Sequence, residues 1–355
     1  MKIKQGLITV VNFIGIGWSL HTLMYSLDKM RTKRGGVFLL SEYVINDNSQ
    51  IVERYKPDVS IALLREFEPM AIALHSDGYY LTYSGGKDSD TDLEIAQEAG
   101  VKFSVHYNIT TVDAAQCLIH IKQTRERLSK KGIQLYLEPP GKFKDGTQKT
   151  MWSLIERKGM PPTRICRYCC DHLKERGGKG RLVITGVRWS ESTARKSRKP
   201  LEIVTSQRKD KKLFNDNDKD RRLFENCMQK GKRVVNPIIN WLDEDVWQYI
   251  TERKVPYCSL YDLGEKRIGC IGCPMGGTKG QEEDFERYPH YKKLYIQAFD
   301  KMLIRMDFRG IKHDWKTGND VFDWWLYSTD SEQKKILEGQ ISMYYNEDEE
   351  LWEIE

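Results

Sequence analysis

The sequence has 355 residues, of which 39% are hydrophobic and 30% are charged, a globular composition that excludes an intrinsically disordered chain. Its 57 lysines and arginines only slightly exceed its 51 acidic residues, so the net charge of +6 suits an anionic ligand but does not require a nucleic acid. The eight cysteines do not indicate a disulfide-stabilised secreted domain, because a chain of this length can build its own core.

The N-terminal 57 residues are interpreted as an extension. An apolar stretch over residues 7–18 follows two lysines, as in a secretory signal, but Asn12 and two glycines interrupt it and no clean cleavage site follows. No run reaches the ~18 apolar residues that a membrane-spanning helix needs. We therefore expect a cytoplasmic protein with no membrane association, and secretion is the alternative.

Strand-like and helix-like segments alternate over residues 58–186, which predicts a parallel sheet covered by helices on both faces. The strand candidates are residues 79–83, 101–109, 133–137 and 181–185. One helix is expected over 92–99, ending at Gly100. A second is expected to have Asp113 as its N-cap. Its apolar face is predicted to hold Cys117, Leu118, Ile121 and Leu128.

Beyond residue 200 the pattern changes twice. Residues 200–235 are polar and charge-dense, and we predict a mobile insertion there. A helix is then expected to start at Asp243, with acidic residues in its first turn. Residues 277–355 are predicted to form a helical C-terminal region, with a helix over 291–306 and an aromatic segment around Trp324.

A phosphate-binding loop is predicted where the strand over 79–83 ends. Glycines allow a tight turn that presents backbone N–H groups to an anion, and the following helix N-terminus adds its positive end. A lysine supplies a point charge and serines supply hydroxyl groups. The loop consists of Ser84, Gly85, Gly86, Lys87, Asp88 and Ser89.

This loop resembles the SGGKDS signature of the PP-loop ATP pyrophosphatases, and three later motifs resemble the phosphoadenosine phosphosulfate (PAPS) reductase family. They are Cys-Cys-x-x-Leu-Lys at 169–174, Gly-Val-Arg-x-x-Glu-Ser-x-x-Arg at 186–195, and Pro-Ile-x-x-Trp with Asp-Val-Trp-x-Tyr-Ile over 237–250. The resemblance covers roughly residues 79–276. It implies a three-layer α/β/α sandwich with a mostly parallel sheet and the nucleotide at the carboxyl ends of its strands. We therefore assign residues 58–276 to a nucleotide-binding domain of this type.

The resemblance also implies a set of site residues around the loop. Lys174, Arg188 and Arg195 belong to the substrate end, where guanidinium forks bind phosphate or sulfate oxygens. Gly186 and Glu191 belong to the nucleotide site, with Glu191 orienting an arginine. Lys87 and Asp88 act with these cations in catalysis. Neighbouring basic residues, Arg181 among them, are interpreted as solvated or as loose nucleic-acid contacts.

Two positions depart from the family pattern. Asp90 and Asp92 follow Asp88 where an apolar helix is usual, and three carboxylates beside phosphates would require Mg²⁺ between them. We therefore expect ATP bound with Mg²⁺. Leu242 replaces the usual Ser or Thr cap of the helix at 243, and we expect Asp243 to take over as the cap.

The cysteines form a second pattern. An adjacent pair followed by Cys-x-x-Cys resembles the [4Fe–4S] ligands of cluster-bearing members of the family, which implies Cys169, Cys170, Cys270 and Cys273 as ligands. The alternative is a structural Zn²⁺ held by Cys166, Cys169, Cys270 and Cys273. Cys117, Cys227 and Cys258 match neither pattern and are interpreted as buried or incidental.

Three functions remain open on the sequence. The preferred one is an ATP pyrophosphatase sulfurtransferase, which adenylates an acceptor before a sulfur nucleophile displaces AMP. Its partners would be a persulfide carrier and a tRNA or DNA acceptor. The second is a PAPS or APS reductase with an external thiol, since no cysteine follows Cys273. The third is a non-catalytic nucleotide- or nucleic-acid-binding module.

Overall fold

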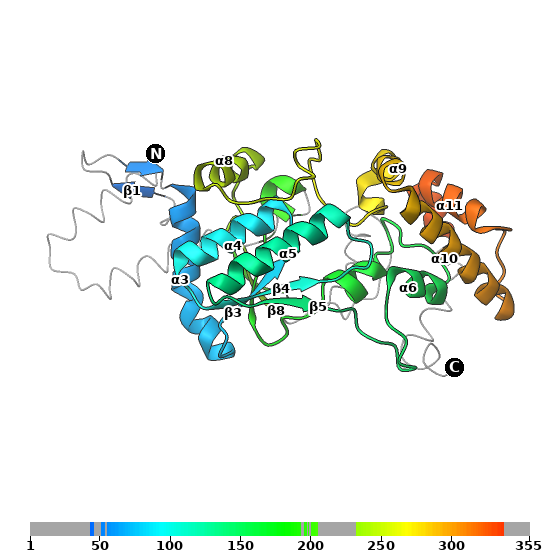
Figure 1. Cartoon of the computed structure of the whole chain (residues 1–355), viewed down its shortest axis with the longest axis horizontal. Coiled ribbons are helices and arrows are strands. Elements are labelled where there is room, and N and C mark those ends of the chain that lie inside the picture. Colours follow the sequence, from blue (N-terminus) through cyan, green and yellow to red (C-terminus); the bar gives the residue numbers. More distant parts are fainter. Residues whose placement is uncertain are drawn as a thin grey trace.

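A six-stranded sheet forms the centre of the computed structural model, which describes residues 43–45, 51–53, 55–192, 195–196, 198, 200–204 and 232–336 (Figure 1). The strand order is β5-β4-β3-β6-β8-β7, with five parallel strands and an antiparallel edge strand β7. The strands are β3 (Tyr79–Tyr83), β4 (Phe103–Asn108), β5 (Leu135–Glu138), β6 (Leu182–Ile184), β7 (Leu201–Val204) and β8 (Lys232–Val235). A separate antiparallel pair consists of β1 (Tyr43–Ile45) and β2 (Ile51–Glu53).

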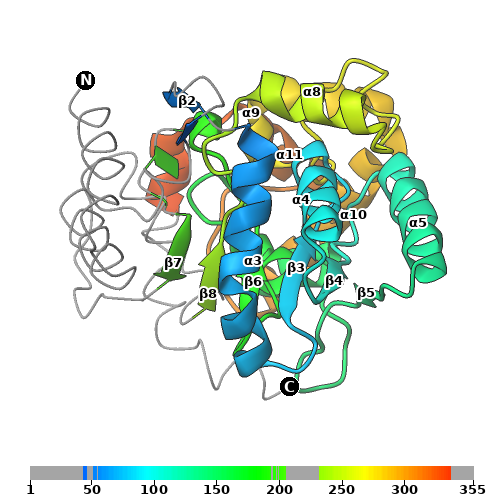
Figure 2. The ribbon, with the colours of Figure 1, turned by 90° about the vertical axis from the view of Figure 1, so that its left-hand side faces the viewer.

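Four helices bury one face of this sheet: α3 (Lys56–Leu74), α4 (Lys87–Ala99), α5 (Ala115–Lys130) and α8 (Asp243–Arg253). Figure 2 shows α3 and α4 over the strands, and α8 packs against α4. Alternate side chains of β3, Tyr79, Leu81 and Tyr83, point into this core, as the two-residue period of a strand requires. The predicted α/β/α class with a mostly parallel sheet is confirmed.

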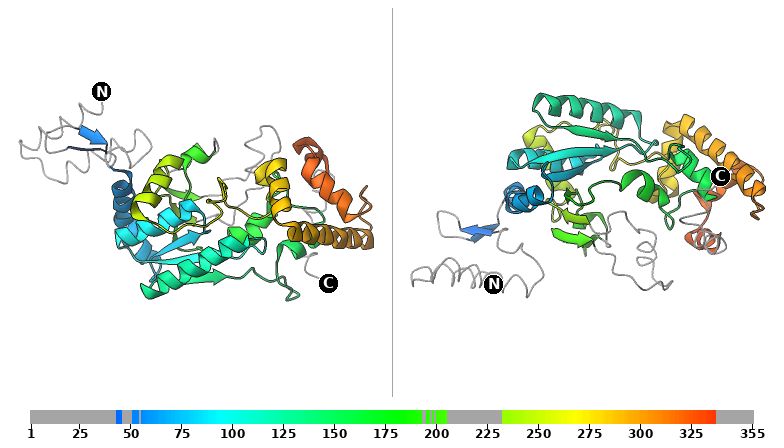
Figure 3. Two further views of the ribbon diagram at one scale, coloured as in Figure 1. Left: turned by 45° about the horizontal axis from the view of Figure 1, so that its top comes forward. Right: turned by 90° about the horizontal axis from the view of Figure 1, so that it is seen from below.

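A second core lies among α6 (Met151–Lys158), α9 (Gly277–Arg287), α10 (Pro289–Phe308) and α11 (Gly318–Tyr327) (Figure 3). Trp325 on α11 packs against Tyr295 and Phe299 of α10, with ring centroids 4.9 and 5.6 Å apart. The helix predicted over 291–306 lies within α10. Because α6 packs against α10, the central domain contributes directly to the C-terminal core.

Several local predictions need correction. The helix predicted over 92–99 already begins at Lys87, although its end at Gly100 is correct, since Gly100 has a left-handed φ of 66°. Asp113 does not cap α5; its carboxylate accepts hydrogen bonds from the amide and hydroxyl of Thr110 at 2.9 and 2.8 Å. Leu118 is exposed, whereas Cys117, Ile121 and Leu128 are buried as predicted.

The stretch predicted as a mobile insertion has ordered ends. Residues 201–204 and 232–235 form β7 and β8, which pair with each other at the edge of the sheet. The intervening residues 205–231 lie outside the described ranges, as do most of the N-terminal 57 residues. No helix in the described part of the chain has the length and hydrophobicity needed to cross a membrane.

Candidate functional site

A cavity of about 250 Å³ opens at the carboxyl ends of the parallel strands. Residues that directly follow β3, β4 and β6 line it, together with the segments around Lys174 and Cys270. Ligands of open α/β sheets bind at this edge, because loops from several strands meet there. The cavity is therefore the candidate functional site.

The loop over 84–89 forms one wall of this cavity. Gly85 has a φ of 73°, a conformation that side chains other than glycine rarely adopt, and a Cβ there would meet Ile121 at 3.2 Å. Gly86 is the N-cap of α4, so the N–H groups of the first helical turn lie at the loop, where that of Lys87 donates to the Tyr261 hydroxyl at 2.9 Å. The Ser89 hydroxyl donates to the Gly86 carbonyl at 2.8 Å and accepts from the Ser84 amide at 3.2 Å. The loop thus has the tight turn and helix start that a phosphate-binding loop requires.

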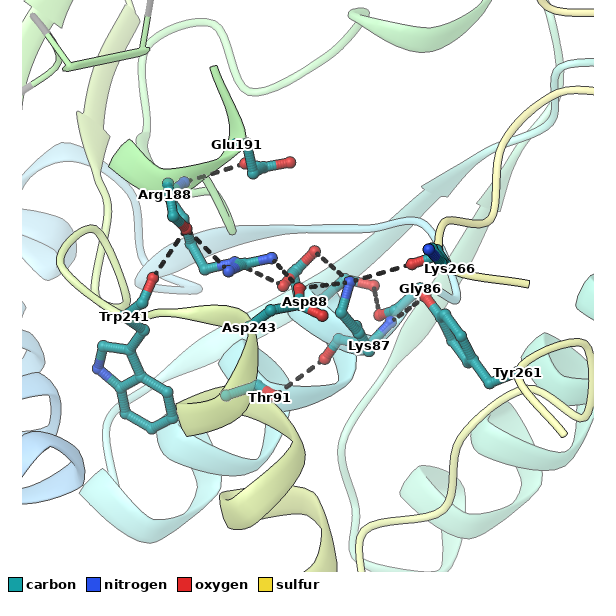
Figure 4. Close-up of polar contacts among 12 residues, drawn as sticks. Gly86, Lys87, Asp88, Thr91, Arg188, Glu191, Trp241, Asp243, Tyr261 and Lys266 are labelled. Carbon is teal, nitrogen blue, oxygen red and sulfur yellow. Dashed lines mark hydrogen bonds and ion pairs between the residues drawn. The ribbon is translucent and has the colours of Figure 1, made fainter. Parts of the chain in front are cut away.

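Two buried cations and two carboxylates meet beside the loop (Figure 4). Lys87 Nζ lies 3.2 Å from Asp243 and 3.8 Å from Asp88. Arg188 bridges the same two carboxylates, with its Nε 2.8 Å from Asp88 and its Nη2 2.8 Å from Asp243. Burial alone would raise the pKa of Asp243, but Lys87 and Arg188 outweigh burial and lower it. Asp243 is consequently ionised and holds both cations in place.

The other two aspartates of α4 do not reach the cavity. Asp90 is buried and accepts from Tyr83 at 2.6 Å, with His120 Nε2 3.0 Å away. Asp92 is fully buried, and neither of its oxygens has a hydrogen-bond partner. The expectation that three carboxylates crowd the phosphates is therefore wrong, because only Asp88 lines the cavity, while Asp90 contacts Tyr83 and His120 and Asp92 is buried against Gly186, one turn after Asp88.

The segment after β6 supplies a further wall. Gly186 lies against α4, and a Cβ there would be 3.0 Å from Asp92 Oδ2, so a larger residue would require α4 to shift. Glu191 accepts from the backbone amide of Arg188 at 3.1 Å and forms an ion pair with Arg195. Glu191, Arg195 and Lys174 line the cavity, whereas Arg188 lies behind it on the two aspartates.

The four cysteines predicted as cluster ligands are brought near one another. Cys169 and Cys170 lie at the start of a short π-helix, η2 (Cys170–Lys174), and Cys270 and Cys273 precede η5 (Pro274–Gly276). The hydrogen bond between Cys169 and Cys170 raises the pKa of Cys169, and burial and the charges of Cys170, Cys270 and Cys273 raise it further. Burial lowers the pKa of Lys174, but the thiolates of Cys270, Cys170 and Cys273 more than offset this.

The side chains of these four cysteines are not arranged around a common centre, as the ligands of one metal site would be. Among the described residues, no group of three or more His, Cys, Asp or Glu side chains has the arrangement of a metal site. Cys170 accepts a hydrogen bond from Arg167 at 3.1 Å, and Cys270 lies 3.6 Å from the Thr110 hydroxyl. The donor set suits an iron–sulfur cluster, since it consists of four thiols from two loops that the fold brings together.

Sequence reasoning missed two residues of this site and misjudged one outside it. Asp243 was expected to cap α8, but Leu242 is the N-cap and Asp245 accepts its amide at 2.6 Å, which leaves Asp243 for the cations. Tyr261 belongs to none of the sequence motifs, yet its hydroxyl accepts the Lys87 amide at 2.9 Å. Arg181, interpreted as solvated, is buried and donates to the Tyr79 carbonyl at 2.7 Å. Of these three residues, only Asp243 could have been found from the sequence, because it lies within the motif over residues 237–250.

A strand, a glycine-rich loop and a helix that follow one another at the carboxyl edge of a parallel sheet define a nucleotide-binding α/β protein of the PP-loop class. Residues 78–275, more than half of the chain, match the sequence model of the phosphoadenosine phosphosulfate reductase domain. The chain belongs to this family, as the motifs indicated.

Relatives with different activities share parts of the sequence. An uncharacterized protein of Methanocaldococcus jannaschii is 24% identical over 304 residues, which cover 83% of this chain and 63% of that protein. A sulfate adenylyltransferase subunit 2 of Sulfurovum sp. is 28% identical over 63% of this chain and 71% of its own length. An adenosine 5'-phosphosulfate reductase of Oceanobacillus iheyensis is 49% identical over 51 residues, 14% of this chain and 21% of that enzyme. The chain thus spans less than two thirds of the length of the first of these relatives.

Solved structures resemble this chain only distantly. A PAPS reductase from Candida auris in a phosphate complex has a TM-score of 0.37 at 20% identity, covering 64% of this chain and 96% of that one. A U34-tRNA thiolase from Methanococcus maripaludis, with its [4Fe–4S] cluster, has a TM-score of 0.32 at 12% identity, covering 74% and 83%. Neither likeness bears on the chemistry of the site.

Proposed function

We propose that this chain is an ATP pyrophosphatase of the PP-loop class that adenylates an acceptor and transfers sulfur to it. The observation that carries the proposal is the single cavity that joins the loop over 84–89 to Lys174, Arg195 and Cys270. A triphosphate bound at the loop would thereby lie in the same cavity as two cations that can bind an anion, Lys174 and Arg195, and as the thiol of Cys270.

The triphosphate would bind at the N-terminus of α4. Backbone N–H groups after Gly86 and the positive end of the helix stabilise phosphate oxygens, and Lys87 adds a charge beside them. Asp88 and Asp243 form ion pairs with Lys87 and Arg188, the cations that a phosphate would need. Mg²⁺ bound with the nucleotide would offset the negative charge of these two carboxylates. The need for Mg²⁺ therefore does not depend on Asp90 or Asp92.

The first step would transfer the adenylyl group. An acceptor oxygen forms a bond to the α-phosphorus of ATP, the α–β phosphoanhydride bond breaks, and pyrophosphate leaves with the electron pair. Lys87, with Arg188 held behind it, stabilises the charge on pyrophosphate. The similarity to a sulfate adenylyltransferase subunit supports adenylyl transfer as the chemistry of this site.

The second step would place sulfur on the activated acceptor. The terminal sulfur of a carrier persulfide bonds to the acceptor carbon, and AMP leaves with the oxygen that it had activated. A second thiol then attacks the carrier sulfur, so that the S–S bond breaks, the carrier and this thiol form a disulfide, and the terminal sulfur stays on the acceptor. Lys174 and Arg195, which also line the cavity, would hold the leaving phosphate. We propose a persulfide carrier as the sulfur donor and a tRNA or DNA base or backbone group as the acceptor.

A [4Fe–4S] cluster would be held by Cys169, Cys170, Cys270 and Cys273, whose thiols interact across two loops. When bound, it would supply redox or sulfur-binding chemistry at the end of the cavity where Cys270 lies. A zinc site that uses Cys166 in place of Cys170 is the alternative.

The test is to identify the products of ATP turnover. Protein purified without oxygen is incubated with Mg²⁺ and ATP, alone and with bulk tRNA or DNA, and the nucleotides are separated. We expect AMP and pyrophosphate in equal amounts, increased by the correct acceptor. Production of ADP and phosphate would refute adenylyl transfer.

A reductase is the second candidate, because a 51-residue segment is 49% identical to an adenosine 5'-phosphosulfate reductase. It would release sulfite from APS or PAPS when an external thiol is supplied. Sulfite release without any pyrophosphate from ATP would establish this function in place of the sulfurtransferase.

A further inference from the structure

Two cysteines outside the proposed cluster lie side by side in the core next to the cavity. Cys117 is on α5 and Cys258 is in the segment after α8, 141 residues later, and their sulfur atoms are 3.9 Å apart. Both side chains are buried, with 4% of Cys117 and none of Cys258 exposed. Two free thiols at this distance need little movement to form a bond, because a disulfide has a sulfur–sulfur length of about 2 Å.

The cavity gives a small reagent access to this pair. Cys117 is among the residues that line it, although almost none of its surface reaches bulk solvent. The hydrogen bond between the two thiols lowers the pKa of Cys258 to about 7, despite its burial. The same hydrogen bond raises the pKa of Cys117, so Cys258 is the member of the pair in which the thiolate, the reactive form of a cysteine, is favoured.

The pair is also connected to the phosphate-binding loop. Cys258 begins a turn in which its carbonyl accepts the amide of Tyr261 at 3.1 Å. The hydroxyl of Tyr261 in turn accepts the Lys87 amide at 2.9 Å, one of the N–H groups that a phosphate would use (Figure 4). Movement of the segment that carries Cys258 would therefore change the access of an anion to the loop.

We propose that Cys117 and Cys258 are a redox-active dithiol that a peroxide converts to a disulfide, and that this disulfide holds Tyr261 on the loop and weakens nucleotide binding. The second half of this proposal rests on the proposed function, because it requires ATP to bind at the loop. The first half does not.

The reaction balances with hydrogen peroxide as the oxidant. One sulfur of the pair attacks a peroxide oxygen, the O–O bond breaks, and the sulfur becomes a sulfenic acid while hydroxide leaves. The second sulfur then attacks the first, the S–S bond forms, and the S–O bond breaks to release water. Two thiols lose two electrons and two protons in total, and the peroxide becomes two water molecules.

Nucleotide and oxidation would oppose each other. If the disulfide weakens ATP binding, bound ATP must disfavour the disulfide by the same factor, since the coupling between two sites is reciprocal. A nucleotide in the cavity would also block the path by which peroxide reaches Cys117. We therefore expect ATP with Mg²⁺ to protect the pair.

The first test maps the disulfide in the full-length protein. The reduced protein is treated with hydrogen peroxide, remaining thiols are alkylated, and disulfide-linked peptides are identified by mass spectrometry. We expect a Cys117–Cys258 link that forms more slowly with Mg²⁺ and ATP present. It should be absent from Cys117→Ser and retained in the matched control Cys166→Ser. A protein in which both thiols remain alkylatable, or pair with other cysteines, would overturn the dithiol.

The second test measures ATP affinity by calorimetry before and after oxidation. We expect the oxidised wild type to bind ATP about fivefold more weakly or worse, with recovery on reduction. Cys258→Ser given the same treatment should keep its affinity, which controls for damage to other cysteines. Tyr261→Phe should bind ATP more tightly than the wild type in the oxidised state, because it lacks the hydroxyl that occupies the Lys87 amide.

The two proposals can fail separately. Equal affinities of the oxidised and reduced wild type would overturn the link from the dithiol to the loop. If the reduced protein binds no ATP at all, the proposed function fails, and peptide mapping alone then decides whether the dithiol exists.

Discussion

Arg188 connects the two carboxylates of the site through the shape of its guanidinium group. Its Nε and Nη2 lie 2.8 Å from Asp88 and Asp243, with the side chain almost completely buried. A lysine ammonium is a single point charge and cannot lie beside both carboxylates as the extended guanidinium does. We expect Arg188→Lys to lower ATP turnover about tenfold or more, nearly as much as Arg188→Ala.

Steady-state pyrophosphate release from the two variants checks this expectation. The control is Arg253→Lys, which changes an exposed arginine paired with Glu98 and should leave turnover unchanged. Near-normal turnover in Arg188→Lys would show that only its charge matters.

For single residues, sequence motifs predicted the local backbone conformation better than they predicted which side chains are in contact. The order of residues 84–89 fixes a turn and a helix start because glycine conformations and helix termini are local properties. Whether Arg181 is solvated or donates to Tyr79 depends on a strand that is distant in the sequence. For the same reason the sequence did not reveal that Asp243 faces Lys87 and Arg188.

At the scale of elements, helix α4 carries a buried acid. Burial raises the pKa of Asp92 well above its usual range, the neighbouring Asp88 raises it further, and Arg188 opposes both. The folded protein therefore keeps a proton on Asp92 at pH values where the unfolded chain has lost it. The stability that this proton contributes is fully present below the pKa that Asp92 has in the unfolded chain. It is lost as the pH rises through the higher pKa that Asp92 has in the folded protein.

The variant Asp92→Asn removes this proton linkage. We expect the free energy of unfolding of the wild type to fall relative to Asp92→Asn as pH rises from 5 to 8, by up to ~1.4 kcal/mol per pH unit. Urea titrations at four pH values measure the difference, with the exposed Glu244→Gln as the control. Parallel stability curves for the wild type and Asp92→Asn would mean that Asp92 is ionised in the folded protein.

The strands were the elements that sequence patterns predicted best. Residues 79–83 form β3 as expected, because a short run of aromatic and β-branched residues is bounded by turns. The start of α4 was placed five residues late, since its polar first turn has no apolar periodicity. The pairing of β7 with β8 could not be predicted, because antiparallel contacts across a long connection leave no local signal.

At the scale of the whole molecule, the cysteine loops join the sheet to the C-terminal helices. Cys169 and Tyr168 pack in the second core together with Tyr295 of α10, which lies near Cys270, Cys169 and Cys273. The chain continues from η2, which Cys169 precedes, into β6 of the sheet. A metal held by both loops would thus also hold two parts of the fold together.

The identity of the ligands distinguishes the two metal sites. We expect anaerobic protein to contain about four irons per chain, and Cys170→Ser to lose them while Cys166→Ser keeps them. Iron and zinc analysis of both variants provides the measurement. One zinc per chain that is lost in Cys166→Ser and kept in Cys170→Ser would establish the zinc site instead.

If ATP binds at the loop over 84–89, the Lys87→Ala variant should bind it more weakly, and calorimetry measures this difference. Lys87 is buried beside the N-terminus of α4, between Asp88 and Asp243. Loss of one charge-assisted contact in such a site predicts ATP binding at least about tenfold weaker, or ~1.4 kcal/mol, with Mg²⁺ present. The exposed Lys301→Ala on α10 should bind ATP as the wild type does. Equal ATP affinity in the wild type and Lys87→Ala would contradict the account.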